Sequence, residues 1–232
     1  MSSSIQEYFF TSRDEASKAC ANRLASSLSV QLAQNGSTSV VVTGGSSPAA
    51  CYAELSGADL DWSQVTVVPS DERWLSADDD NSNEKLIREK LLVAAAEPAD
   101  FVPLYKSGVS RQARCEELNT MLPAIPLPFA ATLLGMGDDG HIASLFPDAA
   151  NLNAGLNPAS EQMCIAVDTS ASTHPRLSLT IAALLQSKEL VLLFFGNNKR
   201  DVYEAAKTGE QDYPVSALLS QDQSPVKVYW AA

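Results

Sequence analysis

Short runs of apolar and β-branched residues recur along the whole chain and alternate with stretches of helical character. The runs lie at residues 40–42, 65–68, 131–134, 164–167, 190–195 and 226–229. Such continuous apolar runs are typical of strands that are buried on both faces of a sheet. The helical stretches, several with apolar residues three and four positions apart, lie at residues 14–33, 83–95, 111–121, 176–186 and 199–207. This alternation predicts an α/β fold with a largely parallel central sheet that is flanked by helices.

The length and composition of the chain bound its organisation. Its 232 residues, of which 45% are hydrophobic, are enough for one substantial core. No internal repeat divides them, so we expect a single domain over residues 1–232. The best candidate for a subdomain boundary is the proline-rich stretch 123–128, although a rigid approach to the next strand is the preferred interpretation.

The sequence indicates neither a membrane span nor a secretory leader. The longest apolar run, residues 190–195, is far shorter than the roughly 20 residues of a spanning helix, and the first residues lack the basic and apolar regions of a signal peptide. We therefore expect a cytoplasmic protein. Its four cysteines are widely spaced without a Cys-x-x-Cys pair, so we expect them to be buried and to form neither disulfides nor a zinc site.

The formal net charge of −12 argues against a nucleic-acid partner, because recognition of a phosphate polymer needs a basic face. A small anion needs only a few local cations and backbone N–H groups, which an acidic protein can still gather in one pocket. The expected partner is therefore a small molecule, with no membrane and no nucleic acid, and the protein itself is expected to be a monomer or a homodimer.

Polar clusters follow several predicted strands, at the carboxyl ends where open parallel sheets bind ligands. The first, Thr-Gly-Gly-Ser-Ser-Pro at residues 43–48, follows the run 40–42 and precedes a short helical stretch. Gly44 and Gly45 allow a close approach to an anion, Ser46 adds a hydroxyl donor, and a helix N-terminus carries partial positive charge. The cluster fits either a phosphate cradle or an ordinary strand-to-helix turn.

The second cluster, Asp-Glu-Arg at residues 71–73, follows the run 65–68. Arg73 is suited to bidentate phosphate binding, with Asp71 positioning it or binding a sugar hydroxyl; the alternative is a surface salt-bridge turn. The acidic stretch 78–83 looks superficially like a calcium loop. Asn83 stands where that loop needs glycine, so helix capping is the preferred interpretation.

The third cluster, Gly-Met-Gly-Asp-Asp-Gly-His at residues 135–141, is the most specific. Three of its first six residues are glycine, which permits a tight loop that presents Asp139 and His141 side by side. A neutral imidazole can accept a proton from water, and a neighbouring carboxylate stabilises the imidazolium that results. A structural histidine is the alternative, and a metal site would need more ligands than His174, the only other histidine, supplies.

The fourth cluster is divided between two segments, Thr-His-Pro-Arg at residues 173–176 and Gly-Asn-Asn-Lys at residues 196–199. Lys199 enters a predicted helix after the run 190–195 and could complete a cationic phosphate site with Arg73 or Arg176. The alternative is a solvated helix start.

The chain resembles the 6-phosphogluconolactonase family in segments that run in order over most of its length. These segments are 43–48 (TGGSSP), 71–73 (DER), 135–147 (GMGDDGHIASLFP), 175–180 (PRLSLT) and 196–199 (GNNK). The departures are small: Thr43 and Ser47 exchange one hydroxyl residue for another, and His174 stands where a second proline is common.

The resemblance implies a NagB/RpiA-like fold of modified Rossmann type, no metal or organic cofactor, and hydrolysis of 6-phospho-D-glucono-1,5-lactone in the oxidative pentose phosphate pathway. It also implies roles for particular residues. His141 matches the general base, Asp139 the carboxylate beside it, and Arg73 and Lys199 the cations that hold the phosphate. Residues 44–46 match the substrate loop.

Two other functions compete with lactone hydrolysis. Glucosamine-6-phosphate deaminases of the same fold have a glutamate where this chain has Phe146, and a phenyl ring cannot transfer protons. A sugar-phosphate-binding protein without turnover would have no need of both Asp139 and His141.

Overall fold

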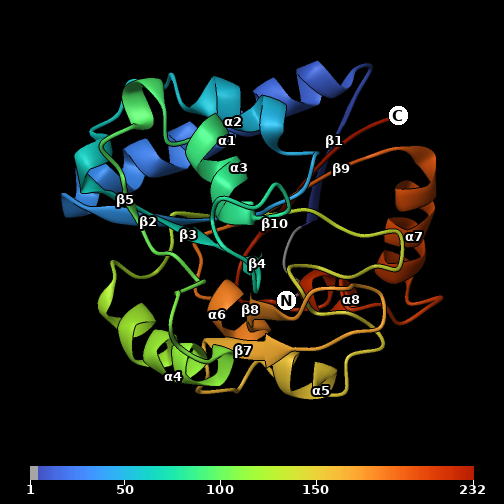
Figure 1. The fold of residues 1–232 in the computed structure, drawn as a ribbon. Helices are drawn as coiled ribbons and strands as arrows, with labels where there is room; N and C mark the ends of the chain where they lie inside the picture. The colour runs from blue at the N-terminus through green and yellow to red at the C-terminus, as the bar shows by residue number, and fades with distance from the viewer. Residues whose placement is uncertain (1–4) are drawn as a thin grey trace.

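A parallel sheet forms the centre of the molecule in the computed structural model, which describes residues 5–232 (Figure 1). Within these residues seven strands lie in the order β1-β10-β9-β6-β2-β3-β5, and every neighbouring pair is parallel. Their bounds are β1 Ile5–Phe10, β2 Thr38–Val42, β3 Val65–Pro69, β5 Asp100–Phe101, β6 Ala131–Leu134, β9 Leu190–Phe195 and β10 Val226–Ala231. The predicted α/β class is confirmed, and five of the six predicted strands belong to this sheet.

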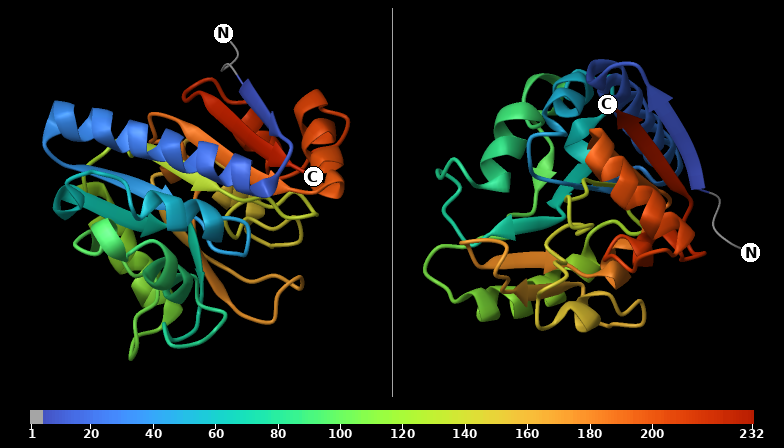
Figure 2. Two further views of the ribbon diagram at one scale, coloured as in Figure 1. Left: turned by 90° about the horizontal axis from the view of Figure 1, so that it is seen from above. Right: turned by 90° about the vertical axis from the view of Figure 1, so that its right-hand side faces the viewer.

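The inner strands of this sheet are almost entirely buried on both faces, as their apolar runs predict. In β2, Val40 and Val42 belong to one apolar cluster and Val41 to another, and all three are fully buried. The cluster of Val40 is covered by α1 (Arg13–Asn35) and α2 (Ala49–Leu55), which lie side by side on one face (Figure 2). The opposite face packs against α4 (Arg111–Met121) and a second sheet.

The second sheet has three antiparallel strands in the order β4-β8-β7, and it corrects two predictions. Residues 164–167 form β7 (Cys164–Val167), which belongs to this sheet and not to the parallel one. The predicted helix 176–186 is instead β8 (Arg176–Leu179) followed by the single turn α6 (Ile181–Leu184). The reason is that β8 pairs with both β4 (Asp71–Arg73) and β7, while Thr180 caps α6 by accepting from Ala183 N at 3.2 Å.

Helices α3 Asn83–Lys90 and α7 Asn197–Thr208 follow the prediction with shifted ends. The short helices α5 Leu152–Gly155 and α8 Ser216–Leu219 are not among the predicted elements. Helix α3 ends before the predicted residue 95, because Val93 is extended (φ −136°) and Ala94 has a left-handed φ of 52°. The backbone there leaves helical geometry and joins the loop that leads to β5.

Three further expectations bear on the fold. The proline-rich stretch leads directly into β6, and its Pro126 carbonyl accepts a hydrogen bond from Ser39 Oγ, which fits a rigid approach to the strand. The four cysteines are all buried and free, as expected. Among residues 5–232, no helix is both long and apolar enough to cross a membrane.

Candidate active site

Four neighbouring strands of the parallel sheet, β9, β6, β2 and β3, bring the polar clusters together. Each of these strands is followed directly by one of the segments that the sequence singles out. Strand β3 lies on one side of β2, whereas β6 lies on the other, so the chain changes direction across the sheet between β2 and β6. Such a switch point is where open α/β sheets form ligand crevices.

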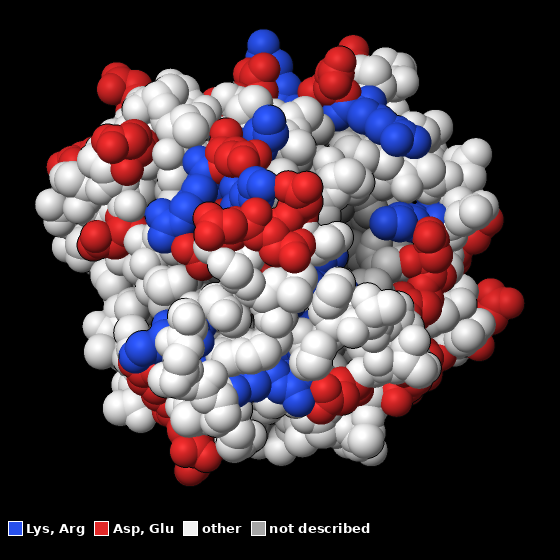
Figure 3. All heavy atoms as spheres, viewed as in Figure 1, with Lys and Arg blue, Asp and Glu red and all other residues white. Residues whose placement is uncertain are grey.

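A cavity of about 340 Å³ lies at this edge of the sheet. Its lining contains eight of the nine predicted site residues: Gly44, Gly45, Ser46, Asp71, Arg73, His141, Arg176 and Lys199. The ninth, Asp139, contacts His141. Figure 3 shows a hollow to the right of centre, between the positions of β4 and α7, with basic side chains in and beside it. The cavity is therefore locally cationic in an acidic protein.

His141 and Asp139 form a tight pair at one end of the cavity. The imidazole Nδ1 lies 2.5 Å from Asp139 Oδ1, which also accepts from the His141 backbone N–H at 3.2 Å. Burial opposes ionisation of the Asp139 carboxyl, but the hydrogen bonds and charge interaction with His141 outweigh it and lower the pKa of Asp139. Because Nδ1 is engaged, Nε2 is the imidazole nitrogen that remains for a ligand or water.

The loop that carries this pair requires glycine at two positions. A Cβ at Gly137 would lie 2.2 Å from His141 Nδ1, and a Cβ at Gly140, where φ is +73°, would lie 2.6 Å from Tyr213 Cβ. Any side chain at either position would displace a neighbour. The glycines therefore allow the imidazole to fold back over its own loop.

The glycine loop after β2 is packed against Asn83, the first residue of α3. A Cβ at Gly44 would lie 1.9 Å from Asn83 Oδ1, and Asn83 Nδ2 donates to the Asp71 carbonyl at 2.9 Å. Asn83 lines the cavity, a position that the sequence reasoning missed because it considered this residue only as part of a capping segment. The capping itself is confirmed: Ser82 Oγ accepts from Lys85 N at 3.3 Å.

Glu72 fastens β4 to the start of α3. Its buried carboxylate accepts from the backbone N–H groups of Arg73, Asn83 and Glu84 at 2.7–2.8 Å, and from Ser82 Oγ at 3.1 Å. Burial raises the pKa of Glu72 to about 7, although the backbone donors oppose the shift. The Glu72 carboxylate therefore holds the backbone at Arg73 against the start of α3.

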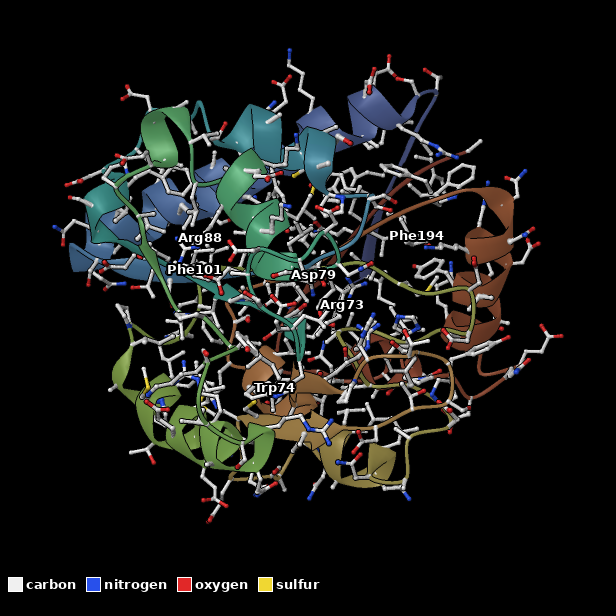
Figure 4. All side chains as sticks on the ribbon, in the orientation of Figure 1. Arg73, Trp74, Asp79, Arg88, Phe101 and Phe194 are labelled. Carbon is white, nitrogen blue, oxygen red and sulfur yellow. The ribbon has the colours of Figure 1, made fainter. Side chains whose placement is uncertain are left out.

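Arg73 and Arg176 are direct cross-strand neighbours in the register of β4 and β8. Figure 4 labels Arg73 between the parallel sheet and the smaller sheet. Its Nη1 donates to the Asn81 carbonyl, while its buried Nε has no hydrogen-bond partner within residues 5–232. Two adjacent guanidinium groups repel each other, and a bound anion would offset that repulsion.

Arg176 is held by a network that includes Ser144, a residue to which sequence reasoning assigned no role. Its guanidinium donates to Ser172 Oγ at 2.9 and 3.3 Å and to Ser144 Oγ at 3.4 Å, and it lies 3.5 Å from Asp71 Oδ2. Ser144 Oγ in turn donates to Asp71 Oδ2 at 2.5 Å. Burial lowers the pKa of Arg176, Asp71 opposes this, and the charge of Arg73 adds to the lowering.

Lys199 lies in the first turn of α7, after Gly196 with its φ of +91°, and its side chain lines the cavity. No ion pair to Lys199 occurs within the described part of the chain, so its ammonium group is available to a ligand. His174 does not line the cavity; its backbone N–H donates to Ser172 Oγ at 3.3 Å.

The protein has a mostly parallel α/β sheet with a cationic cavity and a histidine–aspartate pair at the switch point of the sheet. These features are those of an α/β protein that binds a small anionic ligand. The chain belongs to the glucosamine-6-phosphate isomerase/6-phosphogluconolactonase family, whose model matches residues 11–230. A relative named 6-phosphogluconolactonase, from Caulobacter vibrioides, is 39% identical over 96% of this chain and 95% of its own length.

Solved structures agree with this family and with the fold. A 6-phosphogluconolactonase from Shewanella baltica has a TM-score of 0.93 and 34% identity, and the match covers 99% of this chain and 98% of that one. A monomeric glucosamine-6-phosphate deaminase of the NagB superfamily has a TM-score of 0.76 over 97% of each chain; at 20% identity it shares the fold alone. The expected NagB-like fold is confirmed.

Proposed function

We propose that this chain hydrolyses 6-phospho-D-glucono-1,5-lactone to 6-phospho-D-gluconate in the oxidative pentose phosphate pathway. Relatives named 6-phosphogluconolactonase, which align with nearly the whole chain, support the reaction. The observation that carries the proposal is that the His141 side chain, paired with Asp139, shares one cavity with Arg73, Arg176 and Lys199. The cavity thus combines a base with a site for an anion.

In the proposed mechanism His141 acts as general base. Its Nε2 accepts a proton from water while the water oxygen bonds to the lactone carbonyl carbon, and Asp139 stabilises the imidazolium through Nδ1. The tetrahedral intermediate then collapses, the bond from the carbonyl carbon to the ring oxygen breaks, and the ring oxygen takes the proton back from the imidazolium. The products are a hydroxyl group and a carboxylic acid, which ionises in water.

The phosphate is proposed to bind between the glycine loop and the cations. Gly44 and Gly45 line the cavity, the Cβ position of Gly45 faces open space so that an anion can approach its backbone closely, and Ser46 offers a hydroxyl donor. Arg73 and Lys199 reach the cavity from different elements, so the two charges can contact the phosphate from different directions. Asp71 has its carboxylate oxygens engaged by Ser70, Ser144 and Arg176, which suits a positioning role.

The proposed reaction uses no metal. His141 supplies the base, and the three cations supply positive charge for the anionic substrate. Within residues 5–232, no group of three His, Cys, Asp or Glu side chains is arranged to hold a metal ion.

A direct lactonase assay, corrected for spontaneous hydrolysis of the substrate, tests the proposal. We expect turnover of the phosphorylated lactone well above the uncatalysed rate. Binding of the lactone without turnover would instead identify a sugar-phosphate-binding protein. Release of ammonia from glucosamine 6-phosphate would identify a deaminase, in which case Phe146 would have to be reconciled with the missing glutamate.

A further inference from the structure

The Phe146 side chain packs against both His141 and Arg176. Its ring centroid lies 4.1 Å from that of the imidazole, with the planes 33° apart, and Arg176 Cζ lies 5.2 Å from the same centroid. Phe146 is 4% exposed and lines the cavity. One aromatic ring therefore contacts both the proposed base and a neighbouring cation.

The hydrogen bond to Asp139 does not by itself fix the plane of the imidazole. It holds Nδ1 at 2.5 Å from the carboxylate, but the ring can still turn about that contact. Packing against a flat aromatic surface opposes this rotation, because turning the imidazole would open a gap on one side and cause a clash on the other. The Phe146 ring thus acts together with the Asp139 hydrogen bond to set the direction of Nε2, and accurate proton transfer needs such a fixed direction.

The backbone between His141 and Phe146 adopts a strained turn. Ala143 has a left-handed φ of 48°, which is unfavourable for an L-residue with a Cβ, and Leu145 N donates to the Ile142 carbonyl at 2.9 Å. This turn reverses the chain and returns Phe146 to the imidazole. Strain of this kind persists where the surrounding structure holds it, and it is concentrated at functional sites.

Arg176 has a different dependence on Phe146. Its guanidinium is bonded to Ser172 and Ser144 and lies 3.5 Å from Asp71, so its position has independent support. Within residues 5–232, the His141 imidazole has a hydrogen bond or ring contact with two side chains only, those of Asp139 and Phe146. Loss of the ring should therefore affect the base more than the cation.

We propose that Phe146 is a positioning residue for the general base. Its ring fixes the plane of the His141 imidazole and so the direction in which Nε2 meets the attacking water. The inference rests on the proposed lactonase function, in which His141 is the base.

Two substitutions at this position test the inference through steady-state kinetics on the phosphorylated lactone. Phe146→Leu removes the flat surface but remains apolar; kcat should fall about ten- to a hundredfold, with KM within about threefold of wild type. Phe146→Tyr keeps the ring and should retain kcat within about threefold. Phe146→Met fills a similar volume and replaces Phe146→Leu if the latter does not fold.

Phe101→Leu is the matched control. Phe101 also lies under an arginine, with Arg88 Cζ 4.7 Å from its ring centroid (Figure 4), but it belongs to the edge strand β5 and does not line the cavity. Phe101→Leu makes the same substitution as Phe146→Leu and removes the same type of contact with an arginine. Its kcat and KM should both match wild type.

The imidazole signals in the NMR spectrum give a readout that does not depend on turnover. The chain has two histidines, so His174→Asn assigns the signals of His141. Nuclear Overhauser contacts between the His141 and Phe146 rings should be present in wild type, and those between His141 and the substituted ring should persist in Phe146→Tyr. In Phe146→Leu the imidazole signals should move and broaden.

Several results would overturn the inference. These are an unchanged kcat in folded Phe146→Leu, a rise in KM alone, an equal loss in the leucine and tyrosine variants, or no Overhauser contact between the rings in wild type. Wild type that hydrolyses no lactone would overturn the proposed function, and with it this inference. Active wild type with an equally active Phe146→Leu would overturn only the role of Phe146.

Discussion

The two sides of the cavity come from different kinds of structure. On the loop side, segments that leave the parallel strands β2, β6 and β9 carry Gly44, His141 and Lys199. On the sheet side, the antiparallel strands β4 and β8 carry Arg73 and Arg176. His141, the proposed base, thus lies on a glycine-rich loop that can fold back on itself, whereas the two arginines are held in register by strand pairing.

The electrostatics of the two sides differ as well. On the loop side, His141 has its partner carboxylate within the same loop, at 2.5 Å. On the sheet side, Arg73 and Arg176 are cross-strand neighbours, and the buried Arg73 Nε has no hydrogen-bond partner in the described chain. His141 on the loop side is thus paired with a carboxylate, whereas Arg73 on the sheet side, like Lys199 on the loop side, has positive charge available for an anionic ligand.

The largest expected effect lies on the loop side. His141→Asn should lower kcat about a hundredfold or more, because general base catalysis contributes roughly that factor, while the fold and KM change little. Steady-state kinetics and a thermal unfolding curve measure both. His174→Ala is the control and should have much less effect, since His174 does not line the cavity. Near-normal turnover in a folded His141→Asn variant would show that His141 is not the general base.

The next prediction concerns the loss of one cation from each side of the cavity. Arg73→Ala and Lys199→Ala should each lower kcat/KM by about ten- to two-hundredfold, which is roughly 1.5 to 3 kcal/mol for a charge-assisted contact. Much of the loss should appear in KM. Some loss of kcat is also expected, because phosphate binding helps to place the lactone ring.

The unphosphorylated lactone is the control for these two variants. It has no phosphate to lose and should be a poor substrate for wild type and variants alike. An equal fall on both lactones would mean that the cations stabilise the reacting centre or the fold instead of the phosphate. A fall for Arg73→Ala alone would place the phosphate entirely on the sheet side.

A third effect concerns the stability of the sheet side, through Glu72. Its pKa of about 7 in the folded protein lies above the ordinary 4.5, so the folded state holds the proton more tightly than the unfolded chain does. The free energy of unfolding should therefore fall as the pH rises from about 4.5 to 7, by on the order of 3 kcal/mol from this group. Chemical denaturation across this range measures it.

Glu72→Gln separates this contribution from those of other groups. The amide does not titrate, so the difference in unfolding free energy between wild type and variant should shift with pH, to the disadvantage of wild type at higher pH. The variant also leaves some of the four donors to Glu72 unpaired, which lowers its stability at every pH. A difference that does not vary with pH would refute the raised pKa.

The smallest expected effect is that of a chelator. Exhaustive treatment with EDTA should leave kcat and KM on the phosphorylated lactone unchanged, because the proposed reaction uses no metal. Activity that is lost to the chelator and restored by one particular metal ion would contradict this. Asp138, Asp139 and His141 would then be the first ligands to examine.

Much of the parallel sheet could be predicted from the sequence because its signal is local. A strand buried on both faces needs a continuous apolar run, and runs such as 190–195 contain that requirement within six residues. Strand β1 carries no such signal, since four of its six residues are exposed at the sheet edge. The smaller sheet was predicted poorly because β4 has three residues and β8 mixes Arg176 and Ser178 with leucines. Their strand character comes from partners far away in the chain.

Parallel strands end at a common edge, so the sequence places the clusters after β2, β3, β6 and β9 at one edge of the sheet. They meet in one cavity because these four strands are neighbours in the folded sheet. The loop glycines and the spacing of Asp139 and His141 can be read from the sequence, because they lie within one segment of seven residues, 135–141. The roles of Ser144, Asn83 and Glu72 depended on contacts between segments 10 to 73 residues apart. Hydrogen bonds and ring packing between distant segments leave no periodic trace in a sequence, because they are set by the three-dimensional meeting of elements that are each specified separately.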